Sequence, residues 1–226
     1  GGTAMAAYQG DLVLARAAAA ANIPMILSGA ALTPLERVKE AGPTAWFQCY
    51  LPGETGPITQ LVERCARAGY ETICLTVDVP VLANRENNVR SGFNNPLRLT
   101  PRLAWDGLVR PRWLFGMLLR TLLTHGMPHT ENMGPRVPLF SLTARRDRGR
   151  RDQLSWKHLE LMRRLWKGRL VVKGVLEKDD ARIARESGAD GIIVSNHGGR
   201  QLDGAAAPLR VLPGIAAQAG NMTVML

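Results

Sequence analysis

The sequence predicts an α/β fold: the first of three observations fits both a (β/α)8-type barrel and an open doubly wound sheet, and the other two favour the barrel. Short apolar strands alternate with helices at a spacing that implies parallel pairing and right-handed crossovers. No GxGxxG motif follows a strand, which argues against a dinucleotide-binding doubly wound sheet. Residues 67–78 and 186–197 both carry a glycine, an apolar strand and a polar end, as repeated βα units would.

The first half of the chain carries clear start and stop signals. The Ala/Leu-rich residues 11–21 predict a helix before a short buried strand over 25–27. Thr33-Pro34-Leu35-Glu36 predicts a capping box at the start of the next helix, with Pro34 at the first helical position. The remaining elements expected here are strands over 46–51 and 72–77, with a helix over 57–68 that stops at Gly69.

The alternation resumes after residue 155. Ser155 is expected to cap a helix that turns Trp156, Leu159, Met162 and Trp166 inward. The elements expected after it are a strand over 170–173, a helix over 178–187, a strand over 191–195, a helix over 208–219 and a strand over 223–226. Because the strands are continuous apolar runs, we expect a sheet that is covered on both faces.

The composition predicts a folded chain in a reducing compartment. Hydrophobic residues make up 46% and charged residues 21%, and no run approaches the roughly 18 apolar residues of a membrane span. The three cysteines, Cys49, Cys65 and Cys74, lie in apolar runs without CxxC spacing. This pattern favours the cytoplasm over a disulfide framework or a structural zinc site.

The net charge of +10 comes from one segment. Residues 85–170 hold 18 of the 29 Lys and Arg residues but only 6 of the 19 Asp and Glu residues. About 95 residues separate Asp78 from Lys173, whereas the other intervals between strands are much shorter. We therefore expect a single domain over 1–226 with a basic insertion at about 85–155, after strand 4 of the barrel.

Residues 101–128 within this insertion allow two interpretations. Tryptophan, leucine and phenylalanine alternate with arginines, which is typical of an interfacial helix on anionic lipid. An ordinary helix packed over the barrel would look similar. His125 and His129 are four residues apart, but Gly126 and Pro128 interrupt the helix that a metal pair would need, so no metal site is predicted.

The arginine-rich run over 145–151 is predicted to be a solvated loop. No aromatic residues interleave the arginines, and such residues are expected where bases stack on a nucleic-acid-binding surface. We therefore expect no nucleic-acid partner.

Polar side chains at the ends of apolar strands predict a functional site. These residues are Ser28, Gln48, Tyr50, Thr76, Asp78, Lys173, Ser195 and His197. Side chains two apart on a strand share a face, and in a barrel the carboxyl ends of the strands meet at the mouth, where active sites form. One such residue alone is readily explained as a hydrogen-bonded buried group, but five strands that end this way indicate a site.

The residue types suit proton abstraction next to a carboxylate. His197 can act as the base, and Asp78 can stabilise its imidazolium form. Arg85 and Arg200 can bind a carboxylate in the bidentate manner of guanidinium groups. Lys173 offers a positive charge to a bound cofactor that becomes anionic.

Four motifs together resemble one enzyme family. They are Ser195–Asp203 (SNHGGRQLD), 75–78 (LTVD), 46–50 (WFQCY) and 171–174 (VVKG). In this order they resemble the FMN-dependent 2-hydroxy-acid oxidases and dehydrogenases, which include glycolate oxidase and the lactate and mandelate dehydrogenases. The resemblance extends over essentially the whole chain. It implies a (β/α)8 barrel with FMN at the mouth and oxidation of a small L-2-hydroxy acid to the 2-keto acid.

The resemblance also implies a role for each site residue. His197 would be the base, Asp78 its partner, and Tyr50 would hydrogen-bond the substrate hydroxyl. Arg85 and Arg200 would hold the substrate carboxylate. The implied flavin contacts are Lys173 near N1/O2 and, in addition, Thr3, Ala4, Ser28, Gln48, Thr76 and Ser195. The implied surroundings are a homo-oligomer and a peripheral contact of residues 101–128 with the cytoplasmic face of the inner membrane.

By the same resemblance the barrel is incomplete. Most of strand 1, all of strand 8 and the turn that binds the FMN phosphate would be missing, so we expect this polypeptide alone to bind FMN weakly. Three hypotheses for function remain open: an FMN-dependent 2-hydroxy-acid oxidoreductase, a truncated inactive fragment of one, and a basic peripheral module that binds membranes or polyanions without turnover.

Overall fold

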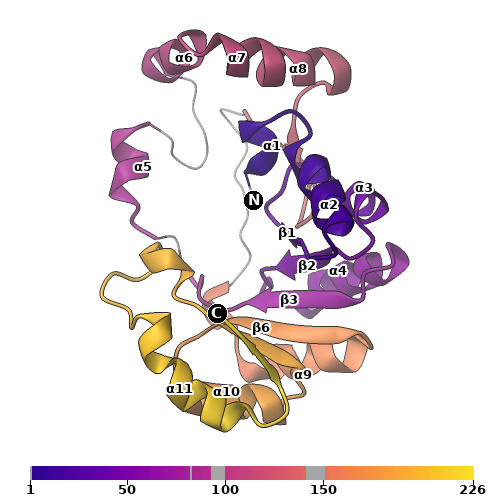
Figure 1. Cartoon of the computed structure of the whole chain (residues 1–226), viewed down its shortest axis with the longest axis vertical. Coiled ribbons are helices and arrows are strands. Elements are labelled where there is room, and N and C mark those ends of the chain that lie inside the picture. Colours follow the sequence, from indigo (N-terminus) through magenta and orange to yellow (C-terminus); the bar gives the residue numbers. More distant parts are fainter. Residues whose placement is uncertain (1, 82, 93–99, 141–150) are drawn as a thin grey trace. The chain divides into compact units, whose positions relative to one another are not determined.

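The chain forms two compact units in the computed structural model, which describes residues 2–81, 83–92, 100–140 and 151–226. Unit 1 comprises Gly1–Ala45 and Arg85–Asp147, and unit 2 comprises Trp46–Asn84 and Arg148–Leu226. Both units are therefore made of two separate stretches of sequence, whose elements are labelled in Figure 1.

Unit 2 is built on a parallel sheet. Its strands are β2 (Trp46–Cys49), β3 (Thr72–Thr76), β6 (Arg169–Val175), β7 (Gly191–Val194) and β8 (Thr223–Met225), and neighbours in the sheet follow that order. An open doubly wound sheet instead reverses its strand order at a switch point. The observed order therefore confirms the predicted parallel α/β sheet and favours part of a barrel.

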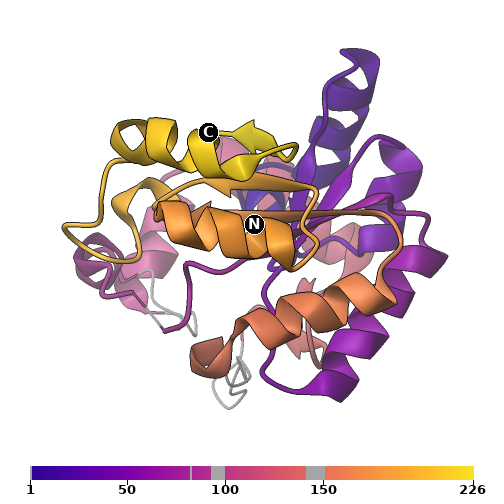
Figure 2. The same cartoon turned by 90° about the horizontal axis from the view of Figure 1, so that it is seen from below.

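Four helices of unit 2 bury their apolar stripes. They are α4 (Thr55–Arg67), α9 (Trp156–Leu165), α10 (Lys178–Glu186) and α11 (Pro208–Ala219). Ile58, Leu159 and Ile215 of these helices are fully buried, as are Ile73 and Leu75 of β3. Helices α10 and α11 lie side by side, as Figures 1 and 2 show. The core of unit 2 is thus formed between helices and sheet.

The predicted strands and helices of unit 2 are confirmed, with bounds that differ by no more than two residues. Ser155 is the N-cap of α9, as predicted, and the capping box is completed by a histidine. The Ser155 backbone N–H donates to Nδ1 of His158 over 3.1 Å. The local start signals of this half of the chain therefore agree with its tertiary structure.

Unit 1 combines a helical N-terminal part with the described part of the predicted insertion. Its elements are α1 (Thr3–Ala6), α2 (Gly10–Ala20), β1 (Ile26–Ser28), α3 (Leu35–Ala41), α5 (Glu86–Arg90), α6 (Pro101–Leu108), α7 (Pro111–Trp113), a π-helix (Leu114–Leu119), α8 (Arg120–His125), β4 (His129–Thr130) and β5 (Val137–Pro138). Strands β4 and β5 pair antiparallel. Helices α6, α7 and α8 follow one another in a row in Figure 1.

The capping box predicted at Thr33 is wrong. Pro34, rather than Thr33, is the N-cap residue of α3, and the side chain of the N-cap residue makes no capping hydrogen bond. Thr33 Oγ1 instead donates to the buried Asp11 Oδ2 over 2.9 Å. The Leu35 N–H donates to Oδ1 of Asn132 over 2.8 Å. A tertiary contact from a residue far along the chain therefore replaces the local cap.

Two further expectations concern the insertion. Among the helices that the structure describes, none is long and apolar enough to cross a membrane. Of the arginine-rich run, residues 145–150 lie outside the described residues, and only Arg151 has a described position.

Candidate active site

The strand register of unit 2 gathers polar side chains on one face of the sheet. Thr76 of β3 pairs with Lys173 of β6, and Lys173 pairs with Ile193 of β7. Residues that pair across a sheet share a face with each other and with the residue two positions along the strand. Lys173 Nζ accordingly donates to Ser195 Oγ over 2.9 Å. Gln48 Nε2 donates to Thr76 Oγ1, also over 2.9 Å.

His197 and Asp78 meet at the carboxyl ends of β7 and β3. His197 Nδ1 lies 2.9 Å from Asp78 Oδ1, and the two side chains are only 21% and 10% exposed. An ionised carboxylate can only accept a hydrogen bond, so this geometry assigns the proton to Nδ1 and leaves Nε2 as the acceptor of the ring. The pair has the arrangement of a histidine base held by an acidic partner.

Asp78 also lies close to a cation. Its Oδ2 is buried, accepts no hydrogen bond from the described residues, and lies 3.8 Å from Lys173 Nζ. The same carboxylate therefore lies between the imidazole and the ammonium group.

The approach of Asp78 to β6 requires glycine at position 174. Gly174 follows Lys173 at an irregularity in the strand and has φ +110°. A Cβ atom there would lie 2.7 Å from the Asp78 Cβ and 3.0 Å from its backbone nitrogen. No side chain fits at this distance, so Gly174 keeps room for the carboxylate.

The backbone of His197 is in the left-handed region. Its φ is 61°, and its N–H donates to Ser195 Oγ over 3.1 Å. Non-glycine residues in this region cost about 1–3 kcal/mol and cluster at functional sites. His197 starts the 3₁₀ turn His197–Gly199, in which Asn196 Oδ1 accepts from the Gly199 N–H. The turn following β7 therefore holds the imidazole over the strand ends.

The other predicted site residues are divided between the two units. In unit 2, Tyr50 follows β2 by one residue, and Arg200 is the exposed residue after the 3₁₀ turn. Unit 1 holds the predicted flavin contacts Thr3 and Ala4 in α1 and Ser28 at the end of β1, as well as Arg85 at the N-cap of α5.

Sequence reasoning missed Arg151. The prediction of a solvated loop does not hold for this residue, because its guanidinium carbon lies 4.6 Å from the centre of the Tyr50 ring and its Nε is buried. The only available signal was its place four residues before Ser155, where the chain must return to the sheet. Gly174 was likewise not singled out, although a glycine within an apolar strand indicates a bulge or a close approach.

The cysteines take no part in this chemistry. Burial raises the pKa of the Cys74 thiol to about 12, although the nearby Lys173 lowers it. Burial also raises the pKa of Cys49 well above its ordinary value. A nucleophilic cysteine needs a thiolate, so these side chains behave as small apolar groups at neutral pH.

Comparisons with known proteins find relatives along the whole chain. The family model described as FMN-dependent dehydrogenase matches residues 1–226. The chain is 38% identical over 220 residues to the L-lactate dehydrogenase of Pseudomonas entomophila, which covers 95% of this chain and 56% of that protein. It is 37% identical over 234 residues to the L-lactate dehydrogenase of a Caulobacter species, with 99% and 59% coverage. The chain thus spans about half the length of the curated relatives it matches.

Solved structures show the same relationship. The monotopic membrane protein (S)-mandelate dehydrogenase superposes with a TM-score of 0.85 at 34% identity, over 98% of this chain and 58% of that one. A mandelate oxidase solved with benzoyl-formic acid gives a TM-score of 0.70 at 31% identity, over 96% and 52%. These relatives are (β/α)8 barrels, which confirms the predicted fold as part of such a barrel. Because the family model matches residues 1–226 and the two L-lactate dehydrogenases are 38% and 37% identical to it, this chain belongs to the FMN-dependent dehydrogenase family.

Proposed function

We propose that this chain carries the catalytic residues of an enzyme that oxidises a small L-2-hydroxy acid to the 2-keto acid with FMN. The observation that supports this most directly is the 2.9 Å contact between His197 Nδ1 and Asp78 Oδ1. An imidazole that is bound to a carboxylate through Nδ1 has the correct tautomer to accept a proton at Nε2. The reaction requires such a base, since oxidation of the C–OH group to C=O removes two electrons and two protons from the substrate, and a group of the protein must accept a proton.

Asp78 stabilises the proton once His197 holds it. The carboxylate faces the imidazole in a largely water-excluded position, where a charge pair is stronger than it is at the surface. Lys173 limits this effect because its ammonium group is 3.8 Å from the other carboxylate oxygen. The three groups therefore keep the site near neutral overall before the anionic substrate binds.

The polar face of the sheet fits the ring of FMN. Gln48 and Thr76 offer an amide and a hydroxyl, and Lys173 and Ser195 an ammonium group and a second hydroxyl, which suit a flat ring with carbonyl oxygens and ring nitrogens. When bound, FMN supplies the acceptor for the two electrons released as the C–OH group becomes C=O. Lys173 would hold the ring at N1/O2. Thr3, Ala4 and Ser28 are the proposed contacts in unit 1.

The substrate class follows from the binding groups and the relatives. Arg85 and Arg200 are proposed to bind the carboxylate, since guanidinium groups form paired hydrogen bonds to carboxylates. Tyr50 is proposed to hydrogen-bond the hydroxyl that is oxidised. The relatives are named for L-lactate and mandelate, both of which are 2-hydroxy acids.

The test is flavin reduction without oxygen. Because this polypeptide alone is expected to bind FMN weakly, the complete protein is loaded with FMN and mixed anaerobically with L-lactate, L-mandelate or glycolate while the flavin absorbance is followed. The proposal predicts bleaching by at least one of these acids and none by the D enantiomers. No bleaching by any 2-hydroxy acid, with FMN bound, would contradict it.

We propose in addition that the protein associates with membranes through residues 101–128, which we call the arginine–apolar segment. Several of its large apolar side chains are exposed, with Trp105 and Phe115 at 65% and Leu123 at 86%. Arginines at 102, 110, 112 and 120 interleave them. Exposed aromatic and aliphatic groups beside arginines are typical of peripheral contact with anionic lipid. A monotopic membrane protein among the relatives supports this proposal.

Vesicle sedimentation tests the membrane contact. Phe115→Glu and Leu123→Glu are expected to reduce binding to vesicles that contain anionic lipid, because each places a negative charge at the lipid surface. Leu209→Glu is the matched control, since Leu209 is 70% exposed on α11 of unit 2. Equal loss in all three variants, or no loss in the first two, would contradict the assignment to this segment.

Three further predictions from the resemblance remain open to test. We propose that residues 1–226 form one barrel domain with an insertion at about 85–155, which is supported by the uninterrupted family match. A homo-oligomer is expected for the complete protein, and light scattering measures its mass. The cytoplasmic face of the inner membrane is the expected location, which fractionation of spheroplasts tests.

A further inference from the structure

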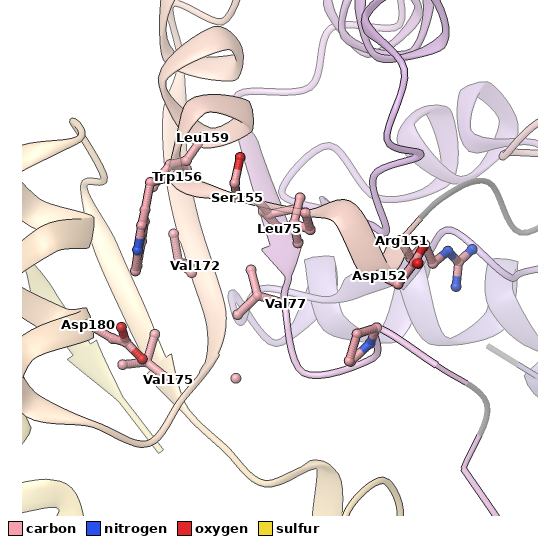
Figure 3. A pocket seen from close by; sticks show the side chains of 13 residues that line it. Leu75, Val77, Arg151, Asp152, Ser155, Trp156, Leu159, Val172, Val175 and Asp180 are labelled. Carbon is pink, nitrogen blue, oxygen red and sulfur yellow. The ribbon is translucent and has the colours of Figure 1, made fainter.

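Arg151 lies at the junction between the insertion and the sheet. It begins the short 3₁₀ turn Arg151–Gln153, directly before the N-cap of α9. Arg151 is one of the residues that line a cavity of about 190 Å³ on the face of β3 and β6 that carries Leu75 and Val172. Figure 3 shows that the side chain of Arg151 is directed away from Val172 and Val175. The guanidinium group therefore does not fill the apolar cavity.

The guanidinium group lies instead over the ring of Tyr50. The distance from Cζ to the ring centre is 4.6 Å, and Nε is buried. A second, much smaller cavity of about 10 Å³ is lined by Tyr50, Thr76 and Arg151 among others. The Arg151 and Tyr50 side chains therefore lie against each other beside this small cavity.

We propose that Arg151 is a positioning residue that acts through Tyr50, holding the phenol ring so that its hydroxyl meets the substrate hydroxyl. The inference rests on the proposed oxidation and on the substrate contact proposed for Tyr50. A cation over the face of an aromatic ring is attracted by the ring quadrupole, and Arg does this more often than Lys. The planar guanidinium also covers the ring face, which a point charge does not.

The role proposed for Arg151 differs from direct binding of substrate. It lies in the turn before α9, whereas the carboxylate ligands proposed above are Arg85 and Arg200. A stacked arginine influences the reaction only through the orientation and hydrogen bonding of the tyrosine. Its removal should therefore matter only while the Tyr50 hydroxyl is present.

A double-mutant cycle in the FMN-loaded enzyme tests this dependence. Arg151→Met keeps much of the side-chain length and removes the charge and the planar group. We expect kcat/KM to fall about 3- to 30-fold, the range of a cation–π contact expressed as a rate ratio, and mainly through kcat. In a Tyr50→Phe background the same substitution should have no further effect. Arg151→Lys should recover part of the loss.

Arg164→Met is the matched control, since Arg164 is an exposed arginine of α9. It should leave kcat/KM unchanged. Three outcomes would overturn the proposal: an unchanged kcat/KM in Arg151→Met, the same loss in the Tyr50→Phe background, or an equal loss in Arg164→Met. The second outcome would indicate that Arg151 contacts the substrate directly.

A measurement without flavin separates this inference from the proposed function. The protein is labelled with 3-fluorotyrosine, and the fluorine NMR signal of Tyr50 is assigned by its loss in Tyr50→Phe. Arg151→Met should shift this signal and Arg164→Met should not. An unshifted signal overturns the positioning role even if the enzyme is active. A shifted signal with an enzyme that reduces no flavin refutes the proposed function and leaves the contact between Arg151 and Tyr50 established.

Discussion

Replacing Asp78 with Asn removes the charge that stabilises protonated His197 while keeping the shape of the side chain. The amide oxygen of Asn can still accept from Nδ1, so the imidazole keeps an acceptor 2.9 Å away. What disappears is the attraction between the imidazolium and the carboxylate. At about 4 Å and an effective dielectric constant of about 20, one such pair contributes about 4 kcal/mol.

This free energy corresponds to a rate effect of roughly 10³-fold, since about 1.4 kcal/mol is a factor of ten. The 10% exposure of Asp78 supports the lower dielectric constant used, because little water reaches the pair. The 21% exposure of His197 reduces the loss, because water screens part of the imidazolium charge. We therefore expect a decrease of about 10²- to 10³-fold in the rate of flavin reduction.

The assay is stopped-flow flavin reduction under anaerobic conditions at saturating substrate. FMN binding should be unchanged, because Asp78 is not among the proposed flavin contacts. Asp179→Asn, at an exposed aspartate of α10, is the control and should react at the original rate. A decrease of less than tenfold in Asp78→Asn would refute the electrostatic reasoning.

Three further predictions concern stability and reactivity. Gly174→Ala should lower the free energy of unfolding by about 1–3 kcal/mol, because its Cβ would lie 2.7 Å from Asp78 and φ is +110°. Gly56→Ala in α4 is the control: a Cβ there meets nothing within 4 Å, so this variant should be as stable as the wild type or more stable. Ser155→Ala should cost about 1 kcal/mol through loss of the N-cap of α9, and urea denaturation measures all three variants. The thiol of Cys74 should not react with Ellman's reagent at pH 8 until the protein unfolds. The free energy of unfolding should also decrease as pH rises from about 9 toward 12, because the thiol loses its proton at a lower pH in the unfolded chain than in the folded one.

Specific results would contradict each of these. Equal stability of the Gly174→Ala and Gly56→Ala variants would show that the close approach of Asp78 is relieved at no cost. An unchanged Ser155→Ala variant would mean that α9 is held by packing alone. Rapid labelling of Cys74 in the native protein would show that its strand opens readily.

The strands of the parallel sheet were predictable because they are short apolar runs, most of which end near a polar residue. The same feature predicted the site, since parallel strands bring their carboxyl ends to one edge and thus bring Asp78 to His197. Two strand ends that are more than a hundred residues apart in sequence meet for this reason alone.

Tertiary contacts explain what local signals did not predict. Thr33 has the sequence of a cap, but the buried Asp11 offers its hydroxyl a charged acceptor, and Asn132 satisfies the helix N–H instead. A pattern of four consecutive residues does not reveal partners that lie far along the chain. Arg151 was misjudged for the same reason, because a run of arginines indicates solvent exposure unless a ring is known to lie beneath one of them.

The central claim is that His197 removes a proton from the substrate, and single-turnover reduction of the bound flavin measures this most directly. The FMN-loaded wild-type protein and its His197→Asn variant are mixed anaerobically with the L-2-hydroxy acid that reduces the wild type fastest. We expect prompt bleaching in the wild type and a rate lower by at least about 10²-fold in the variant, with its flavin still bound and oxidised. Bleaching of the variant at the wild-type rate would contradict the account.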